Sequence, residues 1–139
     1  MAQKLAYFNC IGGVSGDMIL GSMIDTGLST EFLNSVIQDL KLDGVSINAF
    51  KDERQGVTGT KVQIQMDGRT DECYRIKDLL MKLEKSDLTS EIVESSSTIL
   101  QNIGQAESSI HNVDIDTLVL HELGSIDTLI DVTCCVAGL

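Results

Sequence analysis

The chain has 139 residues, of which 42% are hydrophobic and 22% charged, and 21 acidic against 10 basic side chains give it a formal net charge of -11. This length suits one domain with a real core and is short for two, so we expect residues 1–139 to form a single domain. The excess of negative charge argues against nucleic acid and anionic membranes as partners and favours a cation or a basic protein surface.

Targeting and cysteine patterns indicate the compartment. No apolar run is long enough to span a bilayer, and residues 1–20 lack the pattern of a signal peptide, so we expect no membrane partner and a cytoplasmic location. The four cysteines, Cys10, Cys73, Cys134 and Cys135, show no CxxC spacing and no disulfide-scaffold density, which predicts reduced thiols.

The pattern of the N-terminal third predicts a strand, a tight loop and two helices. Residues 4–9 form an apolar run that predicts a buried strand, a glycine-rich turn follows, and residues 15–26 have helical spacing with Gly27 as a stop. Ser29 or Thr30 can cap a second helix, whose apolar residues recur at three- and four-residue steps until about residues 43–44.

The rest of the chain predicts a hairpin and three more helices. Residues 45–49 and 62–66 alternate in hydropathy around a turn within residues 52–56, and helical periods cover residues 72–84, 90–110 and 126–139, with a short extended piece at 118–120. The fold class is therefore α/β, with α+β also compatible: a mixed sheet containing a hairpin, flanked by about five amphipathic helices. The last helix is apolar and still in progress where the sequence stops, so we expect the chain to be part of something longer.

The glycine loop is the first candidate site. Gly12, Gly13 and Gly16 permit a tight turn, and free N–H groups at the following helix start could hold a phosphate or carboxylate. The spacing is not GxGxxG and no P-loop Lys is present, so a plain turn with Ser15 or Asp17 capping the helix is the simpler interpretation. Asp17 could also supply oxygen ligands to a divalent ion. Lys61, after the glycine-rich turn, is more often a solvated strand end than a substrate anchor.

The second candidate site precedes the last helix. His121 and Glu122 are polar within an apolar neighbourhood, and Asp127 and Asp131 lie one helical turn apart with no Lys or Arg nearby in sequence. Imidazole and carboxylates suit Zn²⁺, Ni²⁺ or Mn²⁺. The alternative is a capping Asp127, a solvated Asp131 and a core histidine at position 121.

Three ordered motifs together resemble the N-terminal region of the LarC family, the nickel insertion proteins of nickel-pincer cofactor biosynthesis. The chain carries FNCIGGVSGDMILGSMIDTG, RQGVTGTKVQIQ and AESSIHNVDIDTLVLHELGSIDTLIDV, which are similar in order and spacing to that family's opening, strand and histidine-acid segments. The resemblance spans nearly all of the chain.

The resemblance implies a function. In that family Ni²⁺, as the substrate metal, is inserted into pyridinium-3,5-bisthiocarboxylic acid mononucleotide with hydrolysis of CTP, which makes the enzyme a nickel chelatase or cyclometallase of the lyase class. By position, Asp17, His121 and Glu122 become the expected catalytic residues. They also join Asp127 and Asp131 as expected metal ligands, while Gly12, Gly13, Ser15 and Gly16 would shape a substrate or phosphate loop.

Some positions depart from the family pattern. Asn9 replaces an Asp, Val119 replaces the first His of H-x-H-E, and residues 71–75 replace a histidine-rich segment. The C-terminal region that would bind CTP with Mg²⁺ or Mn²⁺ is absent, so the chain alone is expected to be incomplete. Its expected partners are a nucleotide-like substrate and its own C-terminal region or a separate subunit, and a homo-oligomer is expected. The alternative function is a non-catalytic metal-binding or protein-interaction module.

Overall fold

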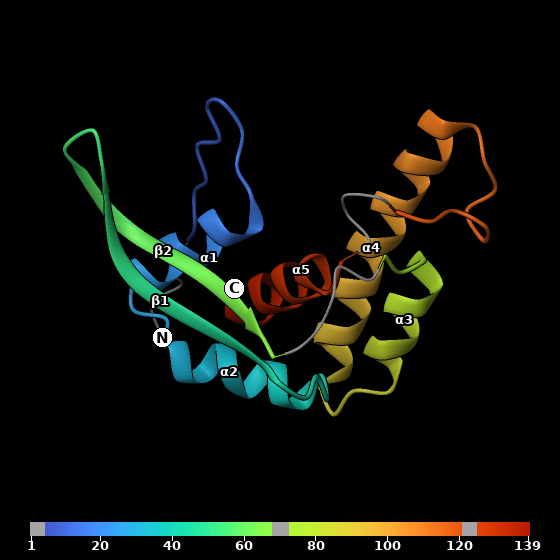
Figure 1. Cartoon of the computed structure of the whole chain (residues 1–139), viewed down its shortest axis with the longest axis horizontal. Coiled ribbons are helices and arrows are strands. Elements are labelled where there is room, and N and C mark those ends of the chain that lie inside the picture. Colours follow the sequence, from blue (N-terminus) through green and yellow to red (C-terminus); the bar gives the residue numbers. More distant parts are fainter. Residues whose placement is uncertain (1–4, 68–72, 121–124) are drawn as a thin grey trace.

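The structure is a computed structural model that describes residues 5–67, 73–120 and 125–139. The elements follow in the order α1 (Gly16–Asp25), α2 (Thr30–Asp39), β1 (Val45–Arg54), β2 (Val57–Met66), α3 (Ile76–Glu84), α4 (Ser90–His111) and α5 (Ile126–Gly138). The predicted five helices and hairpin are confirmed, and the fold is a mixture of α and β elements (Figure 1). None of the described helices is both long enough and apolar enough to cross a membrane.

The hairpin pairs β1 and β2 antiparallel, with a register that runs from Val45 opposite Met66 to Arg54 opposite Val57. Its turn consists of Gln55 and Gly56, whose φ angles are 51° and 79°. Positive φ at both central residues is what a type I′ turn requires, and this turn matches the twist of the flanking strands. The strands consequently extend closer to the turn than hydropathy alone predicts.

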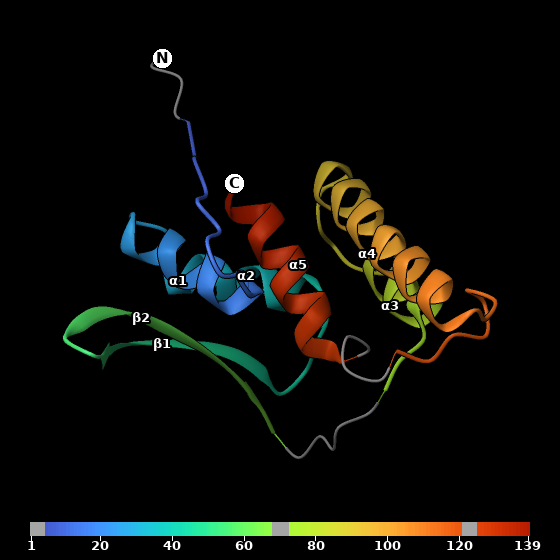
Figure 2. The same cartoon turned by 90° about the horizontal axis from the view of Figure 1, so that it is seen from above.

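Helices α1 and α2 cover one face of the hairpin (Figure 2). The Asn34 side chain on α2 donates to the carbonyl of Ile47 and accepts from its N–H, both at 2.9 Å. On α1, a Cβ at Gly21 would lie only 2.3 Å from the carbonyl oxygen of Thr60. Because the strand backbone approaches α1 this closely, only glycine fits there without a shift, and the hairpin is held in one position against both helices.

The core lies between α1, α2, the inner face of the hairpin, α3, α4 and α5. Its fully buried side chains include Leu20, Leu33, Leu79, Leu83, Leu100, Leu129, Ile130 and Cys134. The serine-rich stretch at 95–98 is helical within α4, as its flanking period predicts, and Ser96 is completely buried. Helix α5 contacts α1, α2 and α4, so it connects the hairpin half with the α3–α4 half.

The predicted buried strand at residues 4–9 is wrong for the described residues of that range. Residues 5–10 have no regular structure, and the side chains of Leu5 and Tyr7 are 94% and 85% exposed. A strand needs a hydrogen-bonded neighbour, and the described sheet contains only β1 and β2. That sheet is antiparallel, so the parallel pair expected of a mixed sheet is absent from the described part of the chain.

Helix α3 begins later than the predicted residue 72. Arg75 has extended backbone angles and forms an isolated antiparallel bridge with Val119, which agrees with the extended piece predicted at residues 118–120. The N–H of Arg75 donates to the Asp78 carboxylate at 3.2 Å. This bond from the N-cap backbone to the side chain at position N3 is part of a capping box, so Arg75 is the N-cap and the helix starts at Ile76.

Candidate functional site

The glycine loop leads into the first turn of α1. Gly12 and Gly13 have φ angles of 86° and 95°, a left-handed conformation that favours glycine, and the N–H of Gly13 donates to the carbonyl of Cys10 at 3.1 Å. Ser15 takes the N-cap position, but its side chain makes no capping bond to the helix and donates instead to the Asp17 carboxylate. The loop therefore presents Asp17, an acidic side chain of the first helical turn.

Helix α5 places the carboxylate of Asp131 against the start of α1. A Cβ at Gly16 would lie 2.5 Å from the Cβ, Cγ and Oδ2 atoms of Asp131. One turn further along α5, the thiol of Cys135 points to the carbonyl of Gly16 with a sulfur–oxygen distance of 3.8 Å. The tertiary structure thus brings the two candidate motifs, far apart in sequence, into direct contact at Gly16.

Asp131 is in an unfavourable environment for a charged carboxylate. Burial, and then the negative charges of Asp17 and Asp127, raise its pKa from 3.8 to about 6. Its Oδ1 atom is buried and has no hydrogen-bond partner among the described residues. Asp17 and Asp127 each occupy the first turn of a helix, where the helix dipole favours negative charge. A cation placed among these carboxylates would relieve the repulsion between them.

The predicted metal ligands are only partly visible in the structure. Asp17, Asp127 and Asp131 interact electrostatically, whereas His121 and Glu122 lie outside the described residues. Within residues 5–67, 73–120 and 125–139, no three His, Cys, Asp or Glu side chains lie close enough together to hold one ion. The full ligand set, and the substrate role of the glycine loop, stay predictions.

The two cysteines of α5 belong to the core side of this region. Cys134 is completely buried, Cys135 is half-buried, and both are free thiols, as the sequence predicts. Burial raises the pKa of both thiols to about 12, to which neighbouring negative groups add. Both are therefore protonated at neutral pH in the metal-free chain and are poor thiolate ligands in that form.

A pocket of about 330 Å³ lies between the start of α1 and the half of the hairpin that is next to its turn. Asp17 and Met18 line it from α1, while Arg54, Thr60 and Lys61 line it from the strands. Arg54 faces Asp52 at 3.7 Å, but Lys61 forms no ion pair with any described residue. The sequence favoured a solvated strand end for Lys61. The signal that indicates more is its place directly after Thr60, whose backbone packs on Gly21 of α1.

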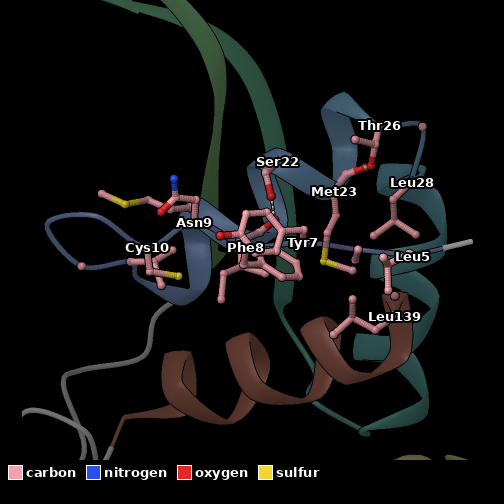
Figure 3. A pocket seen from close by; sticks show the side chains of 17 residues that line it. Leu5, Tyr7, Phe8, Asn9, Cys10, Ser22, Met23, Thr26, Leu28 and Leu139 are labelled. Carbon is pink, nitrogen blue, oxygen red and sulfur yellow. Dashed lines mark hydrogen bonds between the residues drawn. The ribbon is translucent and has the colours of Figure 1, made fainter.

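A larger cavity of about 870 Å³ also borders α1 (Figure 3). Its walls are the N-terminal segment, α1, the connection to α2 and the end of α5. The lining side chains are largely apolar and include Leu5, Tyr7, Phe8, Met23, Leu28 and Leu139.

Comparisons with known proteins agree with one another. A family model described as "Nickel insertion protein" matches residues 6–139. The chain is 36% identical over 130 residues to a protein of Dictyoglomus thermophilum that carries a provisional name as a nickel insertion protein, covering 94% of this chain and 33% of the relative. It is 32% identical over 137 residues to the pyridinium-3,5-bisthiocarboxylic acid mononucleotide nickel insertion protein of Desulfitobacterium hafniense, covering 98% of this chain and 34% of the relative.

The chain therefore spans about a third of the length of these curated relatives. No solved structure shows a significant match.

Proposed function

Because this chain belongs to the nickel insertion protein family, we propose that it forms the nickel-handling part of a protein that inserts Ni²⁺ into a pyridinium bisthiocarboxylate mononucleotide. The name of the Desulfitobacterium hafniense relative supports this substrate. CTP and its Mg²⁺ or Mn²⁺ ion would be bound by polypeptide that the relatives contain beyond the matched third. A cytoplasmic location is proposed as well, since buried reduced thiols such as Cys134 suit that compartment.

The observation that carries the nickel proposal is the half-buried carboxylate of Asp131. Its Oδ1 atom has no hydrogen-bond partner in the described structure, and its pKa of about 6 reflects burial and two nearby negative charges. Ni²⁺ held as a substrate between Asp131 and Asp17 would satisfy the unpaired oxygen and offset the repulsion. His121 and Glu122 would complete the ligand set, since they stand close to Asp127 in sequence.

Calorimetric titration of Ni²⁺ into the purified chain at pH 7.5 tests this proposal, with Mg²⁺ and Zn²⁺ as comparison ions. The double variant Asp17→Asn, Asp131→Asn is expected to bind Ni²⁺ at least about tenfold more weakly, which is about 1.4 kcal/mol. The control variant Asp114→Asn, Asp116→Asn makes the same charge change on the exposed loop after α4 and should bind normally. Equal affinity in all three proteins would refute a nickel site at Asp17 and Asp131.

The pocket beside Asp17 supports a place for the anionic groups of the substrate. Lys61 has no ion pair within the described structure, and Arg54 lies in the same pocket with only a 3.7 Å contact to Asp52. A phosphate or thiocarboxylate could accept hydrogen bonds from both cations. Substrate held there would lie next to Asp17, so that metal and acceptor would meet at the start of α1.

Binding of nicotinate mononucleotide, a pyridinium mononucleotide with a carboxylate and a phosphate, tests the pocket. Lys61→Ala is expected to weaken binding about tenfold by removing a charge-assisted hydrogen bond. The control Lys77→Ala removes the same charge from exposed helix α3 and should leave binding unchanged. Nuclear magnetic resonance titration measures both. If Lys61→Ala binds as the unchanged chain does, the substrate's anionic groups are held elsewhere.

A non-catalytic metal-binding or interaction module is the second candidate function. The exposed apolar residues at the N-terminus and the end of α5, such as Leu5, Tyr7 and Leu139, favour it. A homo-oligomer is proposed as well, through a surface other than these residues, and sedimentation velocity tests it.

A further inference from the structure

The N-terminal segment exposes an apolar surface that the rest of the fold does not use. Leu5, Tyr7 and Ile11 are 94%, 85% and 88% exposed, and residues 5–14 contain no charged side chain. Met18 on α1 and Leu139 at the end of α5, 60% and 75% exposed, continue the surface. Large apolar side chains gathered in this way on a protein surface mark an interaction site.

The backbone groups of residues 5–9 also form no hydrogen bonds within the described structure. Figure 2 shows the segment running away from the helices without a neighbouring strand. Its apolar composition is nevertheless that of a buried strand, the structure predicted from the sequence. A segment with strand composition and unpaired backbone groups is suited to pair with an added strand.

The cavity of about 870 Å³ gives such a strand a place for its side chains. Figure 3 shows Tyr7 and Phe8 between α1 and α5, with Leu5 and Leu139 lining the same cavity. An added strand could therefore bond to the backbone of residues 5–9 and bury apolar side chains against Met23 and Leu28. Both the unpaired backbone and the exposed apolar side chains would be satisfied together.

The relatives indicate which polypeptide could supply the strand. The chain spans 33% and 34% of the length of two of them, so about two-thirds of each relative lies outside the matched part. A second copy of this chain is disfavoured, because it would bring together two molecules that each carry a net charge of -11.

We propose that residues 5–9 form an edge strand that pairs with an extended apolar segment from the remaining two-thirds of a nickel insertion protein. The proposal rests on the family membership and not on the nickel site. The end of α5 and α1 form the floor on which that segment packs.

Overlapping short peptides that tile the unmatched two-thirds of the Desulfitobacterium hafniense relative provide the test. At least one apolar peptide is expected to bind and to slow hydrogen exchange at the amides of residues 5–9. Tyr7→Asp should weaken this binding about tenfold or more by placing a charge in the apolar surface. Ile110→Asp, which alters a side chain that is 74% exposed at the far end of α4, is the matched control.

Three outcomes would overturn the inference: no peptide binds, binding survives Tyr7→Asp, or the chain alone dimerises with protection of residues 5–9. Nickel affinity measured on Tyr7→Asp separates this inference from the proposed function. If the unchanged chain does not bind nickel but binds a peptide through residues 5–9, only the nickel proposal is refuted.

Discussion

The carboxylate of Asp131 is unfavourably placed in the folded, metal-free chain. Its carboxylate is pressed against Gly16, where any side chain larger than hydrogen would collide with it. The charges of Asp17 and Asp127 add to the effect of burial and raise its pKa to about 6. A group that is unfavourable in the metal-free chain and favourable beside a cation is expected at a metal-binding position.

The pH dependence of folding stability tests this environment. Because the folded pKa of Asp131 is raised from 3.8 to about 6, its contribution to stability is full below pH 4 and is lost as the pH rises through 6. The shift corresponds to at most about 3 kcal/mol, which solvent screening of this partly exposed group reduces to about 1–2 kcal/mol. Urea unfolding of Asp131→Asn should lack this loss and show higher stability than the unchanged chain at pH 7.5.

The variant Asp116→Asn is the control for that measurement, since its carboxylate is exposed on the loop after α4. It should keep the pH profile of the unchanged chain. Identical profiles for the unchanged chain and Asp131→Asn would mean that Asp131 is well solvated in the folded state.

Packing between elements depends most sharply on the contact of α1 with β2. Ala in place of Gly within a helix normally adds about 1 kcal/mol of stability. At Gly21 the added Cβ would lie 2.3 Å from the Thr60 carbonyl, so Gly21→Ala is expected to destabilise the chain by about 1–3 kcal/mol. Thermal unfolding measures the change. Gly59→Ala, where a Cβ meets no atom within 4 Å, should be neutral or slightly stabilising; a stabilised Gly21→Ala would contradict this packing.

The element-scale predictions from sequence held where the pattern is local. Helical periods and the Ser29 cap predicted α2, and the Ser29 side chain accepts the N–H of Phe32 at 3.1 Å. Alternation predicted both strands of the hairpin, although the turn at Gln55 and Gly56 is tighter than expected. The strand at residues 4–9 failed because strand formation needs a partner, which a local pattern does not reveal.

At the scale of the whole molecule, α5 is the element that unites the candidate site. It contacts α1, α2 and α4, and it places Asp131 against Gly16, with Asp127 close enough to Asp131 to affect its charge. The pocket with Lys61 and the cavity lined by Tyr7 both border α1 and share Met18 in their linings. The proposed metal ligands, the proposed substrate pocket and the exposed apolar surface of the N-terminal segment thus all lie next to the start of α1.

The sequence by itself determined the family, the five helices, the hairpin and the acidic residues worth testing, because motif order and hydropathy periods depend on neighbours along the chain. Only the tertiary structure decided that Asp131 carries a buried, unpaired carboxylate oxygen, that Lys61 lines a pocket beside Asp17, and that residues 5–9 have no strand partner in the described structure. Burial, electrostatic interaction and strand pairing depend on tertiary contacts between elements that are far apart in sequence. A local sequence pattern does not specify those contacts.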